Sequence, residues 1–253
     1  MRCRWLSLSP LLLGLGGCYI SQLPDPNDVQ GAQRFDAEIM QRNIATAYST
    51  LDLRVQRGEM TPQDRDRHIK ELVDRIAGYI KPDDVRDAEA WRVADIYRQA
   101  GDLDNAKKFY ERAIKVAKTE DRRVNDTLQY ARVLALAGDV PGAVAKAVST
   151  FDAPPKEKAP IMMACLYEIV PAGLGKGHDI ELADLLEKSI SQHMQVQVDP
   201  GSAAGRTFLE TSPIHIGKAW ERVMQIYAKA GRDDLLRKAI ERRDKMADKA
   251  GKV

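Results

Sequence analysis

Apolar residues recur at helical spacing along most of the chain, with glycine, proline or small polar residues between the runs. The first run consists of Phe35, Ile39, Ile44, Tyr48, Leu51 and Val55, and it stops at Gly58. Thr61, Pro62 and Asp64 then supply an N-cap, a first-turn proline and an acidic residue, which together favour a helix start. The next apolar stripe consists of Ile69, Leu72, Val73, Ile76 and Ile80. These runs predict a hairpin of two helices within residues 33 to 81.

The remaining patterns are also helical. No stretch shows sustained apolar and polar alternation with β-branched enrichment, so we predict an all-α fold. Ile161 to Val170 and Ile180 to Met194 predict a further hairpin, joined by the glycine-rich turn 173–177. Gln197 to Pro213 is predicted to be a loop that is either a flexible insertion or functional. Residues 18–31 are rich in proline and aspartate and are predicted to form a flexible tether.

Residues 87–118 carry a distinctive order of small and large apolar residues. It consists of Ala90, Val93, Ala94 and Tyr97, then Gly101 and Asp102, then Ala106, Tyr110 and Ala113. This order resembles a tetratricopeptide repeat. The small Ala94 and Ala106 allow two helices to approach closely, while the tyrosines fill the space towards the next hairpin. Gly101 can end the first helix in a left-handed conformation.

Two further segments resemble the same repeat. Residues 124–150 carry Thr127, Tyr130, Ala131, Leu134, Gly138, Asp139, Ala143 and Ala147. Residues 217–243 carry Trp220, Val223, Met224, Tyr227, Gly231, Leu236 and Ile240. In the second of these segments Leu236 replaces the small alanine, as in a terminal, capping repeat. None of the copies has the proline that usually closes this repeat.

The spacing of the repeats departs slightly from the family. Gly138 follows Gly101 by 37 residues, whereas the family repeat has about 34. We expect the extra residues to lengthen a loop around Thr119 to Val124. The resemblance implies a right-handed solenoid of antiparallel helical hairpins over residues 32–253, in which stacking buries apolar faces that no hairpin can bury alone.

The first eighteen residues have the features of an export signal. Two arginines precede an apolar run from Leu6 to Leu15, which is about half as long as a membrane-spanning helix. Leu15-Gly16-Gly17-Cys18 resembles the lipobox of bacterial lipoproteins, in which the thiol is alkylated by diacylglycerol and the preceding peptide bond is cut. The resemblance implies a signal peptide over residues 1–17 and a lipid on Cys18. The alternative is a secretory signal that is cut elsewhere, with Cys18 an ordinary thiol.

Lipidation would fix the protein at a membrane, because each buried CH₂ of an acyl chain contributes about 0.8 kcal/mol. In Gram-negative lipoproteins an aspartate after the cysteine tends to retain the protein at the inner membrane. Tyr19 stands there in this chain, which implies the outer membrane facing the periplasm. This inference applies only to a Gram-negative source, and the sequence leaves the source open.

Charge argues against nucleic acid as a partner. The chain has 39 Lys and Arg against 37 Asp and Glu, a net charge of +2. Arg2 and Arg4 account for the excess, so removal of residues 1–17 leaves 37 of each sign. A neutral, mixed surface gives no electrostatic reason to expect nucleic acid. The 44% apolar and 30% charged fractions exclude a disordered chain and a polytopic membrane protein.

No pattern in the sequence favours an enzyme, a metal or a cofactor. Cys165 would be the one free thiol after processing, and its apolar neighbours predict a buried, inert group. The four histidines, His68, His178, His193 and His215, are scattered and lack metal-ligand spacing. Gly173 to Gly177 lacks the spacing of a phosphate loop and is predicted to be a turn.

The family geometry implies a binding groove along the first helices of the hairpins. It would be lined by Trp91, Asp95, Arg98, Gln99, Leu128, Arg132, Leu136, Glu221, Gln225 and Lys229. Trp91 is either an anchor for a peptide in that groove or a buried core residue. The Lys/Asn pattern with which some co-chaperones of this family grip a peptide carboxylate is absent, since Trp91 and Asp95 stand in the corresponding places.

These features predict a membrane-anchored helical-repeat lipoprotein that binds an envelope protein or peptide, as a scaffold or assembly factor. The alternative is an envelope binding module for a small molecule or glycan, built from the turn Gly173 to His178 and the segment Gln197 to Pro213. An enclosed pocket rimmed by both segments would favour that alternative. The partner and the oligomeric state do not follow from the sequence.

Overall fold

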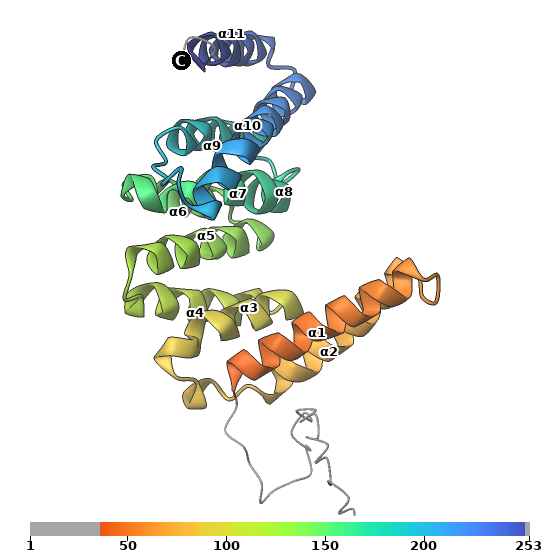
Figure 1. The fold of residues 1–253 in the computed structure, drawn as a ribbon. Helices are drawn as coiled ribbons and strands as arrows, with labels where there is room; N and C mark the ends of the chain where they lie inside the picture. The colour runs from red at the N-terminus through yellow and green to blue at the C-terminus, as the bar shows by residue number, and fades with distance from the viewer. Residues whose placement is uncertain (1–35, 251–253) are drawn as a thin grey trace, which may run out of the picture. The chain divides into compact units, whose positions relative to one another are not determined.

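The computed structural model describes residues 36 to 250, and all regular elements in that part are helices (Figure 1). The main helices are α1 (Ala37–Gln56), α2 (Pro62–Tyr79), α3 (Ala90–Ala100), α4 (Leu103–Val116), α5 (Glu120–Leu136), α6 (Val140–Val148), α7 (Ala159–Ala164), α8 (Val170–Gly173), α9 (Asp179–His193), α10 (Ala203–Lys229) and α11 (Asp233–Ala250). Short 3-10 turns lie at Pro82–Asp84, Asp87–Glu89 and Pro155–Glu157, and a π-helical turn, Cys165–Ile169, joins α7 to α8. The predicted signal peptide, Cys18 and the tether lie outside the described residues.

Consecutive helices pack in pairs, and each pair contacts the next. The pairs are α1 with α2, α3 with α4, α5 with α6, α7 and α8 with α9, and α10 with α11. Contacts of α2 with α3, α4 with α5, α6 with α9, and α9 with α10 connect the pairs into one array (Figure 1). The predicted all-α fold of stacked helical hairpins is therefore confirmed.

Two sharp turns repeat the same local chemistry. Gly101 and Gly138 end α3 and α5 with φ of +81° and +90°, a conformation that only glycine adopts without strain. The aspartate after each glycine caps the second helix of the hairpin: Asp102 accepts a hydrogen bond from the Asn105 amide, and Asp139 accepts one from the Gly142 amide. Each Gly-Asp pair thus stops one helix and starts the next.

The connection between α4 and α5 differs from the prediction. Residues 117 to 119 form the whole link, because the Thr119 hydroxyl accepts a hydrogen bond from the Arg122 amide and caps a helix that begins at Glu120. The extra residues extend α5, which has 17 residues against 11 in α3. The predicted loop over Thr119 to Val124 was therefore wrong, since the cap and the acidic first turn favour helix there.

The predicted loop from Gln197 to Pro213 is largely helical. Ser202 accepts a hydrogen bond from the Gly205 amide and caps α10, which runs for 27 residues with Pro213 inside it. Contacts with α9 hold this half of the helix, since the Phe208 ring lies 4.8 Å from that of His193. A Cβ at position 205 would collide with the carbonyl oxygen of Asp199, which explains the glycine. The prediction failed because such contacts outweigh one proline in a helix.

The core of the array follows the repeat pattern. Ala94 and Ala106 have no exposed surface, and the rings of Tyr97 and Phe109 stack with centroids 5.7 Å apart. Small residues thus bring α3 and α4 together, while aromatic residues fill the remaining space. In the terminal hairpin, Trp220 and Tyr227 are buried.

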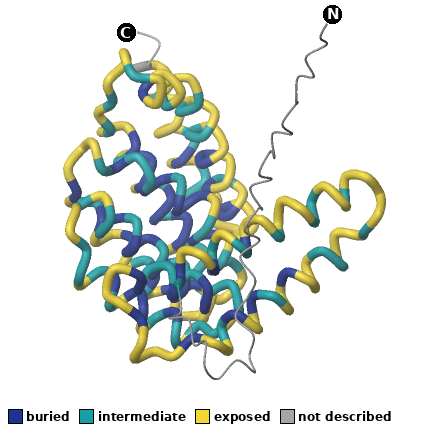
Figure 2. Tube along the Cα trace, turned by 60° about the horizontal axis from the view of Figure 1, so that its bottom comes forward, coloured by how far each residue is buried: buried dark blue, intermediate teal, exposed yellow. Residues whose placement is uncertain are grey.

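The first hairpin is more exposed than its apolar pattern predicts. Ile44 and Val73 are buried, but Tyr48 is 39% and Leu53 is 51% exposed. Figure 2 shows that the far end of this hairpin is mostly exposed. The apolar stripe of α1 is therefore only partly buried, because the half of the helix that is farther from α3 packs on α2 alone.

Candidate functional site

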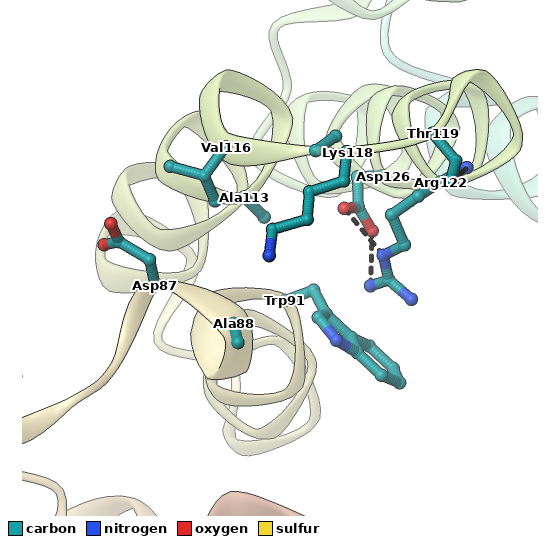
Figure 3. Close-up of a pocket in the computed structure, with 10 residues that line it drawn as sticks. Asp87, Ala88, Trp91, Ala113, Val116, Lys118, Thr119, Arg122 and Asp126 are labelled. Carbon is teal, nitrogen blue, oxygen red and sulfur yellow. Dashed lines mark hydrogen bonds and ion pairs between the residues drawn. The ribbon is translucent and has the colours of Figure 1, made fainter.

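A cavity of about 580 Å³ opens beside Trp91, where the start of α3, the end of α4 and the start of α5 meet (Figure 3). It is lined by Asp87, Ala88, Trp91, Ala113, Val116, Ala117, Lys118, Thr119, Arg122 and Asp126, and we call it the Trp91 cleft. Three of these residues are alanines, whose short side chains leave the hollow open. The cleft thus combines an apolar wall with a charged rim.

A second cavity of about 310 Å³ adjoins the first and shares Trp91, Arg122 and Asp126 with it. Its other lining residues are Asp95, Arg98, Tyr110, Asn125, Gln129 and Arg132. We call it the arginine cavity, because three guanidinium groups line it. All of its lining residues except Tyr110 come from α3 and α5, the first helices of their hairpins.

Trp91 is half-buried, and two guanidinium groups lie over its ring. The Cζ atom of Arg122 is 3.6 Å and that of Arg92 is 4.4 Å from the ring centroid. Such cation–π contacts hold the indole in place. Trp91 is therefore not a fully buried core residue, and its ring is covered in part by arginine side chains. It lines both cavities and separates them.

The carboxylate of Asp95 organises the α1 side of the arginine cavity. Its ion pair with Arg98 is 2.5 Å long. The amide nitrogens of Gln99 and Gln41 donate hydrogen bonds to it at 2.8 and 3.4 Å. This network joins α1 to α3 and holds the polar side chains of Asp95, Arg98 and Gln99 in place without a bound partner.

On α5, two arginines are paired unequally. The Arg122 guanidinium contacts the Asp126 carboxylate at 2.6 Å, whereas Arg132 lies 3.3 Å from Glu168 of the π turn. Glu168 also accepts a hydrogen bond of 2.7 Å from Gln129. Arg132 therefore shares its carboxylate and is the more weakly paired arginine of the two.

Burial shifts the pKa values of several groups in the arginine cavity. Desolvation and the nearby Arg98 guanidinium lower the pKa of Arg132. Burial raises the pKa of Asp126, against the opposing effect of Arg122. Burial also raises the pKa of Tyr110. Charged groups in such a site interact more strongly than they would on an open surface.

A third cavity, of about 330 Å³, lies between the π turn with α8 and the middle of α10. Its lining residues are Leu166, Tyr167, Pro171, Lys218, Glu221, Arg222 and Gln225. Tyr167 is 46% exposed and gives this cavity an accessible aromatic ring. Within the described residues, neither Lys218 nor Arg222 forms an ion pair.

The structure brings together part of the predicted groove. Trp91, Asp95, Arg98 and Arg132 line the arginine cavity, and Gln99 contacts Asp95 beside it. Glu221 and Gln225 line the separate third cavity.

Three predicted groove residues lie elsewhere. Leu128 is only 1% exposed and belongs to the core, so its placement in the groove was wrong. Leu136 contributes its carbonyl oxygen to the Lys176 ammonium group. Lys229 is exposed in the last turn of α10, outside the three cavities. Arg132, one helical turn after Leu128, does line the arginine cavity.

Several lining residues were missed by the sequence analysis, chiefly Lys118, Arg122, Asp126 and Gln129. The signal was present, because Thr119 followed by two acidic residues is a helix start. A helix that begins there places positions 122, 126, 129 and 132 on neighbouring parts of one face. The predicted loop concealed the first of these positions, Arg122.

The remaining polar groups considered in the sequence analysis are buried or paired within the fold. Burial raises the pKa of the Cys165 thiol to about 12, as expected for an inert group. The Lys176 ammonium donates to the carbonyl oxygens of Ala135 and Leu136 and so caps α5. His178 contacts Glu181 at 2.7 Å. Within residues 36–250, no cluster of His, Cys, Asp and Glu is arranged to hold a metal ion.

Comparison with known protein families identifies one helical repeat in the part of the chain that lines the cavities. The tetratricopeptide repeat family model matches residues 91–120. No curated protein matches the chain. The chain is similar to a crystal structure of nearly identical TPR-like repeats of a Podosopora anserina kinesin light chain, with 13% identity, a TM-score of 0.40, and coverage of 82% of this chain and 96% of that one. A single-substitution variant of those repeats gives 12% identity, a TM-score of 0.40, and coverage of 83% and 97%.

Tetratricopeptide repeats generally mediate protein–protein interaction and are typically not catalytic. The matched residues include Trp91, Lys118 and the α3–α4 hairpin, which form much of the Trp91 cleft. The described chain is thus an all-α helical-repeat protein whose matched repeat carries the candidate site.

Proposed function

We propose that this protein is a lipid-anchored scaffold or assembly factor of the bacterial cell envelope, which binds a segment of another envelope protein. The observation that carries the proposal is the pair of adjoining cavities between the matched repeat and α5. Their walls combine small apolar side chains with charged groups that are already held by ion pairs. A site fixed in advance binds with a smaller loss of conformational entropy.

The groove is tested by covalent capture. A photo-crosslinking amino acid at Gln129, in the arginine cavity, is expected to give a discrete crosslinked product in intact envelopes. The same amino acid at Lys238, on the exposed side of α11, is the matched control and is expected to give none. Trp91→Ala and Arg132→Glu are each expected to reduce the Gln129 product about tenfold, because central interface residues dominate affinity. Equal products from both positions would contradict the groove.

The membrane part of the proposal rests on the sequence around Cys18, outside the described residues. Within residues 36–250, no helix has the length and apolar character needed to cross a bilayer. In the proposed arrangement, acyl chains on Cys18 hold the helical array at the membrane surface. Several acyl chains together give effectively permanent anchoring.

The anchor is tested by metabolic labelling with an alkyne-bearing palmitate. We expect the wild-type chain to carry the label and Cys18→Ala to lose it completely. Cys165→Ala is the matched control, since it removes a buried thiol and is expected to retain full labelling. The labelled protein is also expected to require detergent for extraction. Equal labelling of wild type and Cys18→Ala would refute the lipoprotein assignment.

A further inference from the structure

The Trp91 cleft differs from the arginine cavity, which is lined mainly by polar side chains of α3 and α5. One wall of the Trp91 cleft comes from the end of α4. Ala113, Val116 and Ala117 form that wall, and Ala88 faces it from the turn before α3. These side chains offer no hydrogen-bonding groups. The hollow between them therefore suits an apolar side chain, whose burial contributes about 25 cal/mol per Å².

One charged group at the rim of the cleft has no ion-pair partner among the described residues. Asp87 is paired with Arg112 at 2.7 Å, and Asp126 is paired with Arg122 at 2.6 Å. Lys118 forms no ion pair or hydrogen bond with any described residue. Figure 3 shows its side chain extending into the cleft towards Trp91. The cleft thus has one positive charge without a partner, next to an apolar hollow.

The arginine cavity differs, because each of its guanidinium groups has a carboxylate partner: Arg98 pairs with Asp95, Arg122 with Asp126 and Arg132 with Glu168. The pair of Arg132 is the longest of these, at 3.3 Å, and its partner Glu168 also accepts a hydrogen bond from Gln129. The positive charge left for a partner's carboxylate is therefore that of Lys118, in the Trp91 cleft.

We infer that the segment bound here has an aliphatic or aromatic side chain next to an acidic one. The apolar side chain fills the hollow lined by the alanines, and the carboxylate of the neighbouring Asp or Glu pairs with the Lys118 ammonium group. This inference rests on the proposed function, since it names the chemistry of the partner segment for the same site.

A peptide selection tests the inference with defined probes. Random peptides displayed on phage, with no free carboxyl terminus, are selected on the full-length protein purified in detergent. We expect the enriched peptides to place Asp or Glu beside Leu, Ile, Phe or Met. Lys118→Glu is expected to reverse the preference to Lys or Arg beside the apolar residue, because only the sign of the rim charge changes.

Binding of a synthetic copy of the most enriched peptide is then measured by fluorescence anisotropy. Lys118→Glu and Ala88→Leu, which fills the hollow from an exposed position, are each expected to weaken binding about tenfold. Lys108→Glu, an exposed lysine of α4 outside the cleft, is the control and is expected to change affinity less than about twofold.

The outcomes separate this inference from the proposed function. Enriched peptides without acidic residues, or binding that is insensitive to Lys118→Glu, would overturn the inference while leaving a peptide-binding groove in place. If the wild-type chain enriches no peptide above background, the groove itself is contradicted, and the inference falls with it.

Discussion

Replacing Tyr110 by alanine is expected to lower the free energy of unfolding by about 3 to 5 kcal/mol. Tyr110 lies on α4, and only 2% of its surface is exposed. Removing a buried aromatic side chain loses its burial free energy and leaves a hole that the surrounding helices fill only in part. Urea denaturation followed by far-ultraviolet circular dichroism measures the change.

Tyr48→Ala is the matched control, because it removes the same side chain from the far part of α1. Tyr48 is 39% exposed, so its loss is expected to cost about 0.5 kcal/mol. A cost below about 1 kcal/mol for Tyr110→Ala would show that α4 is not packed as described. The two substitutions together compare the packed array with the far end of the first hairpin.

His193 is expected to make the fold less stable in mildly acidic solution. The side chain is 3% exposed, and its Nε2 atom lies 2.7 Å from the Ser212 hydroxyl. The Nδ1 atom has no hydrogen-bond partner among the described residues. Burial, with a smaller contribution from His215, lowers the pKa of His193 from 6.5 to about 4. The folded protein therefore holds this imidazole neutral.

The sign of the effect follows from proton binding. Below pH 6.5 the unfolded chain binds a proton at His193 that the folded chain does not, so stability falls as the pH falls towards about 4. Above pH 6.5 both states are neutral there and His193 contributes no pH dependence. One pKa unit corresponds to about 1.4 kcal/mol, so about 2 kcal/mol is lost between pH 6.5 and pH 5.

Unfolding free energies at several pH values test this expectation. His193→Gln keeps a polar group near Ser212 but cannot take up a proton, so its stability is expected to fall less steeply over this pH range. His68→Gln, which removes an exposed imidazole, is the matched control. Identical slopes for wild type and His193→Gln would contradict the buried, neutral imidazole.

Much of the fold could be predicted because its signals are local. A glycine that ends a helix and an aspartate that caps the next are neighbours in the chain, as at Gly101 and Asp102. Helical spacing of apolar residues likewise needs no information about distant segments. For the same reason the hairpin over residues 87–118 is visible in the sequence, and the family model matches most of it.

Local signals could not predict that residues 203–213 are helical. Gly205 and Pro213 both disfavour a helix interior, and the contacts that outweigh them reach back to His193 on α9. Those contacts depend on how two hairpins stack. Local propensity predicts a loop there, and tertiary packing produces a helix.

The candidate site was predicted only in part for a related reason. Trp91, Asp95, Arg98 and Arg132 follow from the repeat, but the Trp91 cleft depends on where α4 ends and α5 begins. The loop predicted over Thr119 to Val124 left out Arg122, and Leu128, which was expected in the groove, is buried. Each residue along a helix turns about 100°, so a small error in rotation changes which side chains face a neighbour.

The sequence by itself determined the helical hairpins and the Gly-Asp turns, because these depend on interactions within a few residues. It also provides the whole basis for predicting a lipid on Cys18. Only the tertiary structure decided which charges meet around Trp91 and which of them lack a partner. Those features arise from the stacking of separate hairpins, where small changes in the position and rotation of a helix determine every contact.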